Sequence, residues 1–196
     1  MSEQELVRDA LNNPINSLPL CELAKSKKHI VIISSDHTRP VPSHITMPIL
    51  LEEIRKYNKD VKITILIATG MHRPTTHEEL VNKYGEKIVK EEEIVIHNAY
   101  EDSDMTFKGI LPSGGELWVN KLVDEADLLI SEGFIEPHFF AGFSGGRKSV
   151  LPGIASKKTV LWNHNAKFIA NKNSRAGNLE AVSYTHLRAH ETRHDL

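Results

Sequence analysis

The chain has 196 residues, of which 40% are hydrophobic and 11 are glycine, and this composition predicts one globular domain or slightly more. The net charge of −2, without basic runs or aromatic platforms, argues against a surface for nucleic acid or an anionic membrane. The single cysteine, Cys21, excludes a disulfide framework, and no segment resembles a membrane span or a signal peptide. We therefore expect a soluble, cytoplasmic protein without a nucleic-acid or membrane partner.

Segments rich in β-branched residues alternate with segments in which apolar residues repeat at helical spacing. Helices are expected at residues 3–12, 19–24, 43–57 (after an N-cap at Ser43), 78–83 (after an N-cap at Thr76) and 156–170 (opening at Ser156). Strands are expected at residues 29–34, 61–68, 94–96 and 128–131, and a β-hairpin at 107–111 and 116–119. This alternation indicates an α/β fold with a mostly parallel, Rossmann-like sheet, flanking helices and a small β-hairpin excursion.

Polar side chains follow three of the predicted strands. Asp36 and Arg39 come after the first strand, His72 after the second, and His138 after the strand at residues 128–131. In open parallel sheets, ligands bind beyond the carboxyl ends of the strands. The three loops are therefore predicted to build a single site.

The loop at residues 133–153 is rich in glycine and ends in a lysine followed by a serine. Gly145 and Gly146 allow a ligand to approach the backbone closely, and their N–H groups are suited to an anion. A phosphate-binding P-loop would need glycine immediately before Lys148, and Arg147 stands there instead. This mismatch disfavours a nucleoside triphosphatase and leaves anion binding by the backbone open.

Four motifs, in order and with matching separations, carry a resemblance to a known family. They are Asp36–Pro40, Ala68–Pro74, Glu136–Gly153 and Trp162–His164. Together they resemble the N-terminal domain of the lactate racemase family, isomerases that invert 2-hydroxy acids with a nickel-pincer nucleotide. The resemblance extends to about residue 181, and it implies a C-terminal lobe that this chain lacks. We expect the chain to fold alone but, as a fragment, to turn over negligibly.

The resemblance also implies how the reaction avoids an unfavourable intermediate. Removing a proton from the α-carbon would leave a carbanion beside a carboxylate, whereas removing hydride leaves a neutral ketone. The family cofactor, a pyridinium mononucleotide with nickel bound by one carbon and two sulfurs, accepts that hydride. Lys148 would carry it covalently as a thioamide, and burial among Phe139, Phe140 and Phe143 would keep the lysine amine unprotonated. Proteins that synthesise the cofactor and insert nickel are implied as partners.

The resemblance assigns three histidines to the chemistry. His164 would supply the remaining nickel ligand, since imidazole suits nickel and three positions are taken by the cofactor. His72 and His138 would be paired general acid/bases, one on each side of the 2-hydroxy acid, because imidazole accepts and returns protons near neutral pH.

The remaining assignments concern anions and orientation. Arg39 would clamp a carboxylate of the substrate or a phosphate of the cofactor through paired hydrogen bonds. Gly145 and Gly146 would meet the cofactor phosphate, and Asp36 would orient either Arg39 or a histidine. The other cationic side chains of these loops are expected to face solvent or cap helices: His37, His44, Arg73 and His77.

Two alternatives remain open at this point. The first is a metal-dependent hydrolase that holds zinc with His72, His138, His164 and Asp36, although no closely spaced histidine pair occurs among them. The second is a non-catalytic nucleotide-binding module on the same fold. Nickel with an organic chromophore would distinguish the racemase from the hydrolase, and an unmodified Lys148 would favour the binding module.

Residues 182–196 differ in character from the rest of the chain. The segment from Val182 to Thr192 resembles the conceptual translation of a sequencing adapter, and we expect residues 182–196 to be a non-native tail. Three histidines in it, His186, His190 and His194, have helical spacing, but we do not interpret them as a metal site. The predicted domain therefore comprises residues 1–181.

Overall fold

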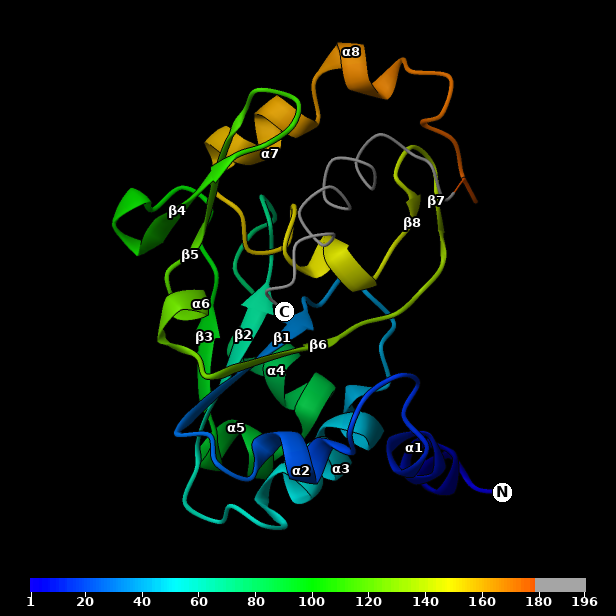
Figure 1. The fold of residues 1–196 in the computed structure, drawn as a ribbon, viewed down its shortest axis with the longest axis vertical. Helices are drawn as coiled ribbons and strands as arrows, with labels where there is room; N and C mark the ends of the chain where they lie inside the picture. The colour runs from blue at the N-terminus through cyan, green and yellow to red at the C-terminus, as the bar shows by residue number, and fades with distance from the viewer. Residues whose placement is uncertain (179–196) are drawn as a thin grey trace.

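A computed structural model of the chain describes residues 1–178, which fold around a central four-stranded sheet (Figure 1). The elements follow one another as α1 (Glu3–Asn12), α2 (Leu20–Ala24), β1 (His29–Ser35), α3 (Ser43–Arg55), β2 (Lys62–Ala68), α4 (His77–Tyr84), α5 (Glu86–Glu91), β3 (Glu93–Ile96), η1 (Asp102–Asp104), β4 (Met105–Ile110), β5 (Glu116–Asn120), α6 (Leu122–Glu125), β6 (Leu128–Glu132), β7 (Pro137–His138), β8 (Gly142–Phe143), η2 (Gly146–Ser149), α7 (Lys157–Asn163) and α8 (Ala166–Ile169). The tail predicted at residues 182–196 lies outside the described residues.

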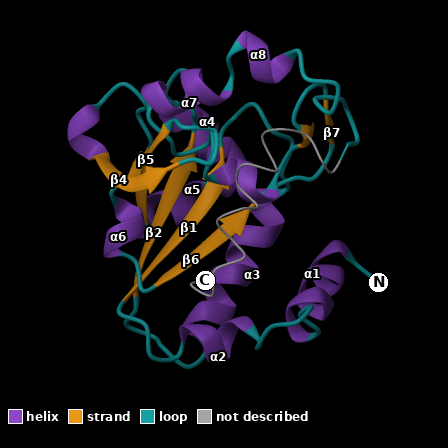
Figure 2. Cartoon of the chain, turned by 45° about the horizontal axis from the view of Figure 1, so that its top comes forward, coloured by secondary structure: helices purple, strands orange, loops and turns teal. Residues whose placement is uncertain are grey.

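The sheet has the strand order β3-β2-β1-β6, and every neighbouring pair is parallel (Figure 2). Its register places Ile32 of β1 beside Ile65 of β2 on one side and Ile130 of β6 on the other. The predicted parallel, Rossmann-like sheet is therefore confirmed, and so is the antiparallel hairpin of β4 and β5. Because all four strands run in one direction, their carboxyl ends share one edge.

The two faces of the sheet are covered by different kinds of structure. Side chains alternate along a strand, so Ile30 and Ile32 of β1 pack with helices α2 to α5 on one face. Val31 and Ile33 pack on the other face with the β4–β5 hairpin, residues 150–155 and α7. This second layer holds the segments that carry the candidate site against the sheet.

Local capping signals correctly mark the start of two helices. The Thr76 hydroxyl accepts from the N–H of Glu79, and the Glu79 carboxylate accepts from the N–H of Thr76, which forms a capping box at α4. Ser156 caps α7 by accepting from Thr159. Gly85, with φ of 84°, ends α4 as predicted, and the short helix α5 that follows it was not expected.

The prediction that Ser43 caps α3 is wrong. Pro42 occupies the N-cap position, and the Ser43 hydroxyl donates instead to the buried carboxylate of Glu132, 2.9 Å away. The helix also ends at Arg55 rather than Tyr57. Ser43 thus links α3 to the end of β6, which is where the glycine-rich loop begins.

The single helix expected at residues 156–170 is divided into two. α7 ends at Asn163, and its C-cap His164 has non-helical backbone angles (φ −102°, ψ 28°). The side-chain oxygen of Asn165, Oδ1, then accepts from the N–H of Phe168, and α8 begins there. The division leaves His164 at a helix end rather than in mid-helix.

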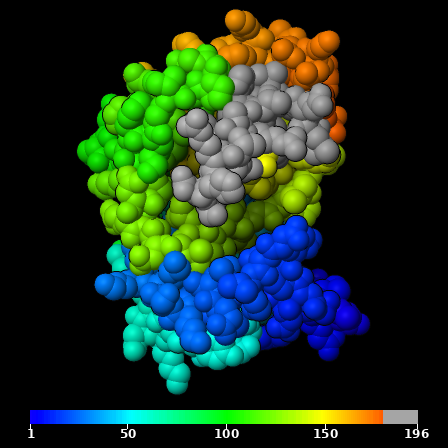
Figure 3. All heavy atoms as spheres, viewed as in Figure 1, coloured from blue at the N-terminus to red at the C-terminus, as the bar shows by residue number. Residues whose placement is uncertain are grey.

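Within residues 1–178, no helix combines the length and the apolar character that a bilayer crossing requires. In the space-filling view, α1 stands at one end of the molecule and α8 at the other (Figure 3).

Candidate active site

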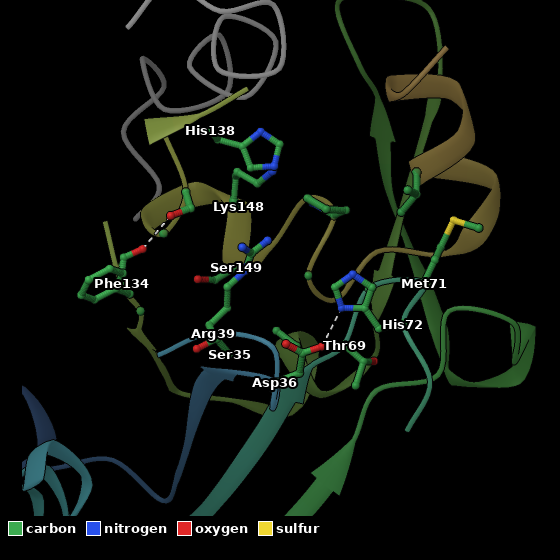
Figure 4. Close-up of a pocket in the computed structure, with 18 of the residues that line it drawn as sticks. Ser35, Asp36, Arg39, Thr69, Met71, His72, Phe134, His138, Lys148 and Ser149 are labelled. Atoms are coloured by element: carbon green, nitrogen blue, oxygen red, sulfur yellow. Dashed lines mark hydrogen bonds and ion pairs between the residues drawn. The ribbon is translucent and has the colours of Figure 1, made fainter. Parts of the chain in front are cut away.

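A cavity of about 440 Å³ lies at the carboxyl edge of the sheet, between the loops that follow β1, β2 and β6 and the end of α7 (Figure 4). Its walls include every residue predicted for the site except Gly146: Asp36, Arg39, His72, His138, Gly145, Lys148 and His164. The convergence of three loops follows from the shared direction of the strands. Gly146 is exposed and does not contribute to the wall.

Asp36 and His72 form a hydrogen-bonded pair. The Nδ1–H of His72 donates to Oδ2 of Asp36 over 2.7 Å, and Asp36 is only 2% exposed. Burial alone would raise the pKa of the Asp36 carboxyl, but hydrogen bonds from Thr38 and His72 outweigh it and leave that pKa below its ordinary value. His72 itself is half exposed, and in its neutral form the remaining lone pair lies on Nε2.

His138 is held in the opposite way. The backbone N–H groups of Phe140 and Ala141 point at its Nδ1, at 3.5 and 3.3 Å, so Nδ1 accepts and the proton of the neutral ring lies on Nε2. Burial, followed by the positive charges of Lys148, Arg39 and His164, lowers the pKa of His138 to about 4. The ring is therefore neutral at neutral pH.

Lys148 lies in the short turn η2. Burial, followed by the charge of Arg39, lowers the pKa of its amine to about 8, so a usable fraction is unprotonated near neutral pH. The expectation that three phenylalanines surround it is correct only in part. Its Nζ lies 5.6 Å from the centroid of Phe140, whereas Phe139 is 77% exposed and Phe143 is partly buried on β8.

His164 lines the cavity, and one of its two ring nitrogens is engaged by the main chain. Its Nδ1–H donates to the carbonyl of Val160 over 3.2 Å, which leaves the lone pair on Nε2. Burial and the nearby charge of Lys148 lower the pKa of His164, so this lone pair is free of a proton at neutral pH. The ring is thus oriented as a one-nitrogen ligand.

No group of three or more His, Cys, Asp and Glu side chains within residues 1–178 is arranged to hold a metal ion unaided. A zinc hydrolase would require His72, His138 and His164 with Asp36 around one ion. The geometry therefore does not support the hydrolase alternative.

Arg39 lines the cavity, and its Nη1 lies 3.4 Å from the carboxylate of Glu136. Of the two partners expected for Asp36, the structure selects His72 rather than Arg39. His37 was expected to face solvent or cap a helix, but its side chain is only 15% exposed and its Nδ1 contacts the Thr75 hydroxyl at 3.1 Å.

Main-chain atoms join two of the site loops, a feature that was not predicted. The N–H of Gly70, two residues before His72, donates to the carbonyl of Gly153 over 2.8 Å. Gly70 has φ of 55°, a conformation that favours glycine. The Gly70–Gly153 bond fixes the loop that carries His72 against the loop that carries Lys148.

Packing alone requires glycine at position 145. A Cβ at this position would lie 2.7 Å from the carbonyl oxygen of Phe134, and φ is 73°. The turn therefore closes onto the start of the same loop only because no side chain intervenes.

The family model described as the lactate racemase N-terminal domain matches residues 1–177. The chain belongs to this family. It is 65% identical over 179 residues to the lactate racemase of Lactiplantibacillus plantarum, which covers 91% of this chain and 42% of that protein. It is 59% identical over 180 residues to the lactate racemase of Thermoanaerobacterium thermosaccharolyticum, covering 92% and 42% respectively. The chain thus spans less than half the length of these relatives.

Solved structures agree with this membership in the lactate racemase N-terminal family. The lactate racemase apoprotein from T. thermosaccharolyticum superposes with a TM-score of 0.94 at 56% identity, covering 96% of this chain and 46% of that one. A protein from Thermotoga maritima has a TM-score of 0.75 at 23% identity, covering 96% and 47%, which shows a shared fold.

Proposed function

We propose that this chain is the N-terminal, cofactor-carrying domain of a racemase that inverts lactate or a related 2-hydroxy acid by reversible hydride transfer. The observation that supports it is the convergence of Lys148, His164, His72 and His138 on one cavity, in a family whose relatives are named lactate racemases. The hydrolase has no comparable support, because the metal-binding cluster it needs is missing from residues 1–178.

The residues present fit a nickel-pincer nucleotide. Lys148 offers an amine that loses its proton near pH 8, as attachment through a thioamide requires. His164 offers a single imidazole nitrogen, which matches a metal whose other ligands come from the cofactor. When bound, this group supplies the position that takes hydride from the substrate and returns it.

The loop after β1 supplies the contact for the substrate. Arg39 lines the cavity, and although its Nη1 lies 3.4 Å from Glu136, its planar guanidinium has further N–H donors suited to a carboxylate. A 2-hydroxy acid held there by its carboxylate places its hydroxyl within the same cavity as His72 and His138.

The two imidazoles handle the hydroxyl proton. In the neutral ring of His72, the hydrogen bond to Asp36 places the proton on Nδ1, so the lone pair that can accept the hydroxyl proton lies on Nε2. In this structure His138 carries its proton on Nε2, so it must exchange tautomer and free Nε2 before it takes the hydroxyl proton, and its low pKa then favours return of that proton. A racemase needs proton donors and acceptors toward both faces of a flat ketone, and two separate imidazoles meet that need.

The proposal is tested by mass. The chain is co-expressed with the proteins that synthesise the cofactor and insert nickel, and its intact and peptide masses are measured. We expect a mass increment on the peptide that contains Lys148, and none in a Lys148→Arg variant. An unmodified Lys148 under these conditions would contradict the covalent cofactor and favour a ligand-binding module.

A further inference from the structure

One aromatic ring contacts three of the residues proposed to act in the cavity. The centroid of Phe140 lies 4.8 Å from that of His138 and 5.1 Å from that of His164, with interplanar angles of 88° and 90°. The Nζ of Lys148 lies 5.6 Å from the same centroid. His138, His164 and Lys148 line the cavity whereas Phe140 does not, so its ring supports them from outside.

Each imidazole is thereby restrained twice. The Nδ1 atom of each ring is held by the main chain, through Ala141 for His138 and through Val160 for His164. An edge-to-face contact with Phe140 is a preferred aromatic geometry and opposes rotation of each ring about its Cβ–Cγ bond. The two restraints together fix the orientation of Nε2 in both rings. The face of Phe140 also attracts the Lys148 ammonium.

We propose that Phe140 is the shared positioning residue of this site, which sets the orientation of His138 and His164 and covers the amine of Lys148. This inference rests on the proposed function for its meaning, since those three residues are the base, the metal ligand and the attachment point. Phe140 acts through them and does not itself meet the reacting atoms.

The neighbouring Phe139 provides a matched control. It stacks on His138 with centroids 4.7 Å apart, yet it is 77% exposed. Among the ring contacts found in residues 1–178, Phe139 meets His138 and Phe140 but not His164 or Lys148. Substituting either aromatic residue removes a ring next to His138, and only one of the two substitutions removes the ring next to His164.

The first test measures how rigidly the imidazoles are held. The chain is prepared without cofactor, with ¹³C-labelled histidine, and the order parameters of the His138 and His164 rings are compared among Phe140→Leu, Phe140→Tyr and Phe139→Leu variants. We expect Phe140→Leu to lower the order of both rings, Phe140→Tyr to preserve it, and Phe139→Leu to affect His138 alone. Unchanged order of His164 in Phe140→Leu would overturn the proposal.

The second test concerns Lys148. Rates of acylation by a small and a bulky activated ester are measured at one pH, and their ratio is taken so that the unprotonated fraction of the amine cancels. We expect Phe140→Leu to raise the bulky-to-small ratio several-fold, and Phe139→Leu to leave it unchanged. Equal ratios in both variants would count against the covering role.

A control for folding, and the independence of this proposal from the proposed function, complete the design. The Asp36–His72 hydrogen bond, which Phe140 does not touch, reports whether each variant keeps the native cavity. Because both tests use the chain without cofactor, they can fail while Lys148 is still modified in cells. They can also succeed when it is not, so the two proposals stand or fall separately.

Discussion

Asp36 and His72 come from two different loops, 36 positions apart, and their hydrogen bond is the basis for proposing His72 as a proton acceptor. The carboxylate is fixed by the N–H and hydroxyl of Thr38, and the opposite oxygen receives Nδ1–H of His72. We expect Asp36→Asn to remove the preference for the Nδ1–H tautomer, because an amide can donate as well as accept. The check is ¹⁵N NMR of the His72 ring, with His164 as the reference ring; a tautomer population like that of the parent chain would contradict the pairing.

The amine of Lys148 should reveal its environment through pH. With a pKa of about 8 instead of 10.5, its acylation rate should reach half its maximum near pH 8. Arg39→Gln removes the lesser cause and leaves burial in place, so the midpoint should rise while staying below 10.5. Peptide mass spectrometry after pulse labelling gives the midpoint. Arg73→Gln, which alters an arginine bound to Glu79 on another loop, should not move it.

The His138 ring should couple stability to pH. Its folded-state pKa of about 4 lies below the 6.5 of an unperturbed histidine. Between these two pH values the ring is protonated in the unfolded chain and neutral in the folded chain. The stability that this ring contributes is present above pH 6.5 and should be lost as the pH falls toward 4. Urea unfolding of the parent chain and a His138→Gln variant at several pH values measures the difference. Identical pH dependence in both would argue against the shift.

At the scale of elements, the β4–β5 turn braces the helix that ends in His164. A Cβ on Gly115 would lie 2.2 Å from Cδ1 of Trp162, so the indole of Trp162 or α7 itself would have to move. We expect Gly115→Ala to destabilise the chain by about 1–3 kcal/mol, as overpacking does, and to shift the NMR signals of His164. Urea unfolding and histidine spectra are the measurements.

A milder change at the same turn is the control. Ser113→Ala removes only the hydrogen bond that the hydroxyl accepts from Trp162 Nε1, 3.1 Å away, and should cost about 0.5–1.5 kcal/mol at most. If Gly115→Ala were no more destabilising than Ser113→Ala, close packing of the β4–β5 turn against Trp162 would not stabilise α7.

The elements that the sequence predicted well are those whose signals are local. Thr76 and Ser156 are followed three residues later by their hydrogen-bond partners, so each cap is contained in a few residues. Ser43 has the same residue type, but Glu132, 89 positions along the chain, takes its hydroxyl. The break between α7 and α8 also has a local signal, because Asn165 is a residue type that favours the N-cap position.

For a similar reason, the sequence could not show which of two adjacent phenylalanines contacts the site residues. Phe139 and Phe140 are chemically identical and differ only in which side of the β7–β8 turn they occupy. One is 77% exposed, and the other meets Lys148 and two histidines. Only the folded loop distinguishes them, because it decides which ring faces α7.

For the whole molecule, strand direction explains why the site could be anticipated. Polar residues after β1, β2 and β6 had to meet, since parallel strands deliver their ends to one edge. The state of each side chain there could not be anticipated. The opposite tautomers of His72 and His138 depend on Asp36 and on the backbone of residues 140–141, which reach them through tertiary structure.

The chain spans 42% of each curated relative, and that fraction sets our last prediction. We expect this chain to bind cofactor at Lys148 yet to racemise lactate negligibly, because it corresponds to less than half of each relative named a lactate racemase. Chiral chromatography of lactate after incubation with cofactor-loaded chain is the measurement, with a full-length relative as positive control. Conversion comparable to that of the relative would show that this domain suffices.

The main-chain bond between Gly70 and Gly153 has an evolutionary consequence. Since neither partner contributes a side chain, mutations elsewhere in the two loops can exchange the chemical groups they display without loosening the clasp that holds the loops together. Descendants of this scaffold can therefore change the side chains that these loops display while keeping the same spacing between positions 72 and 148.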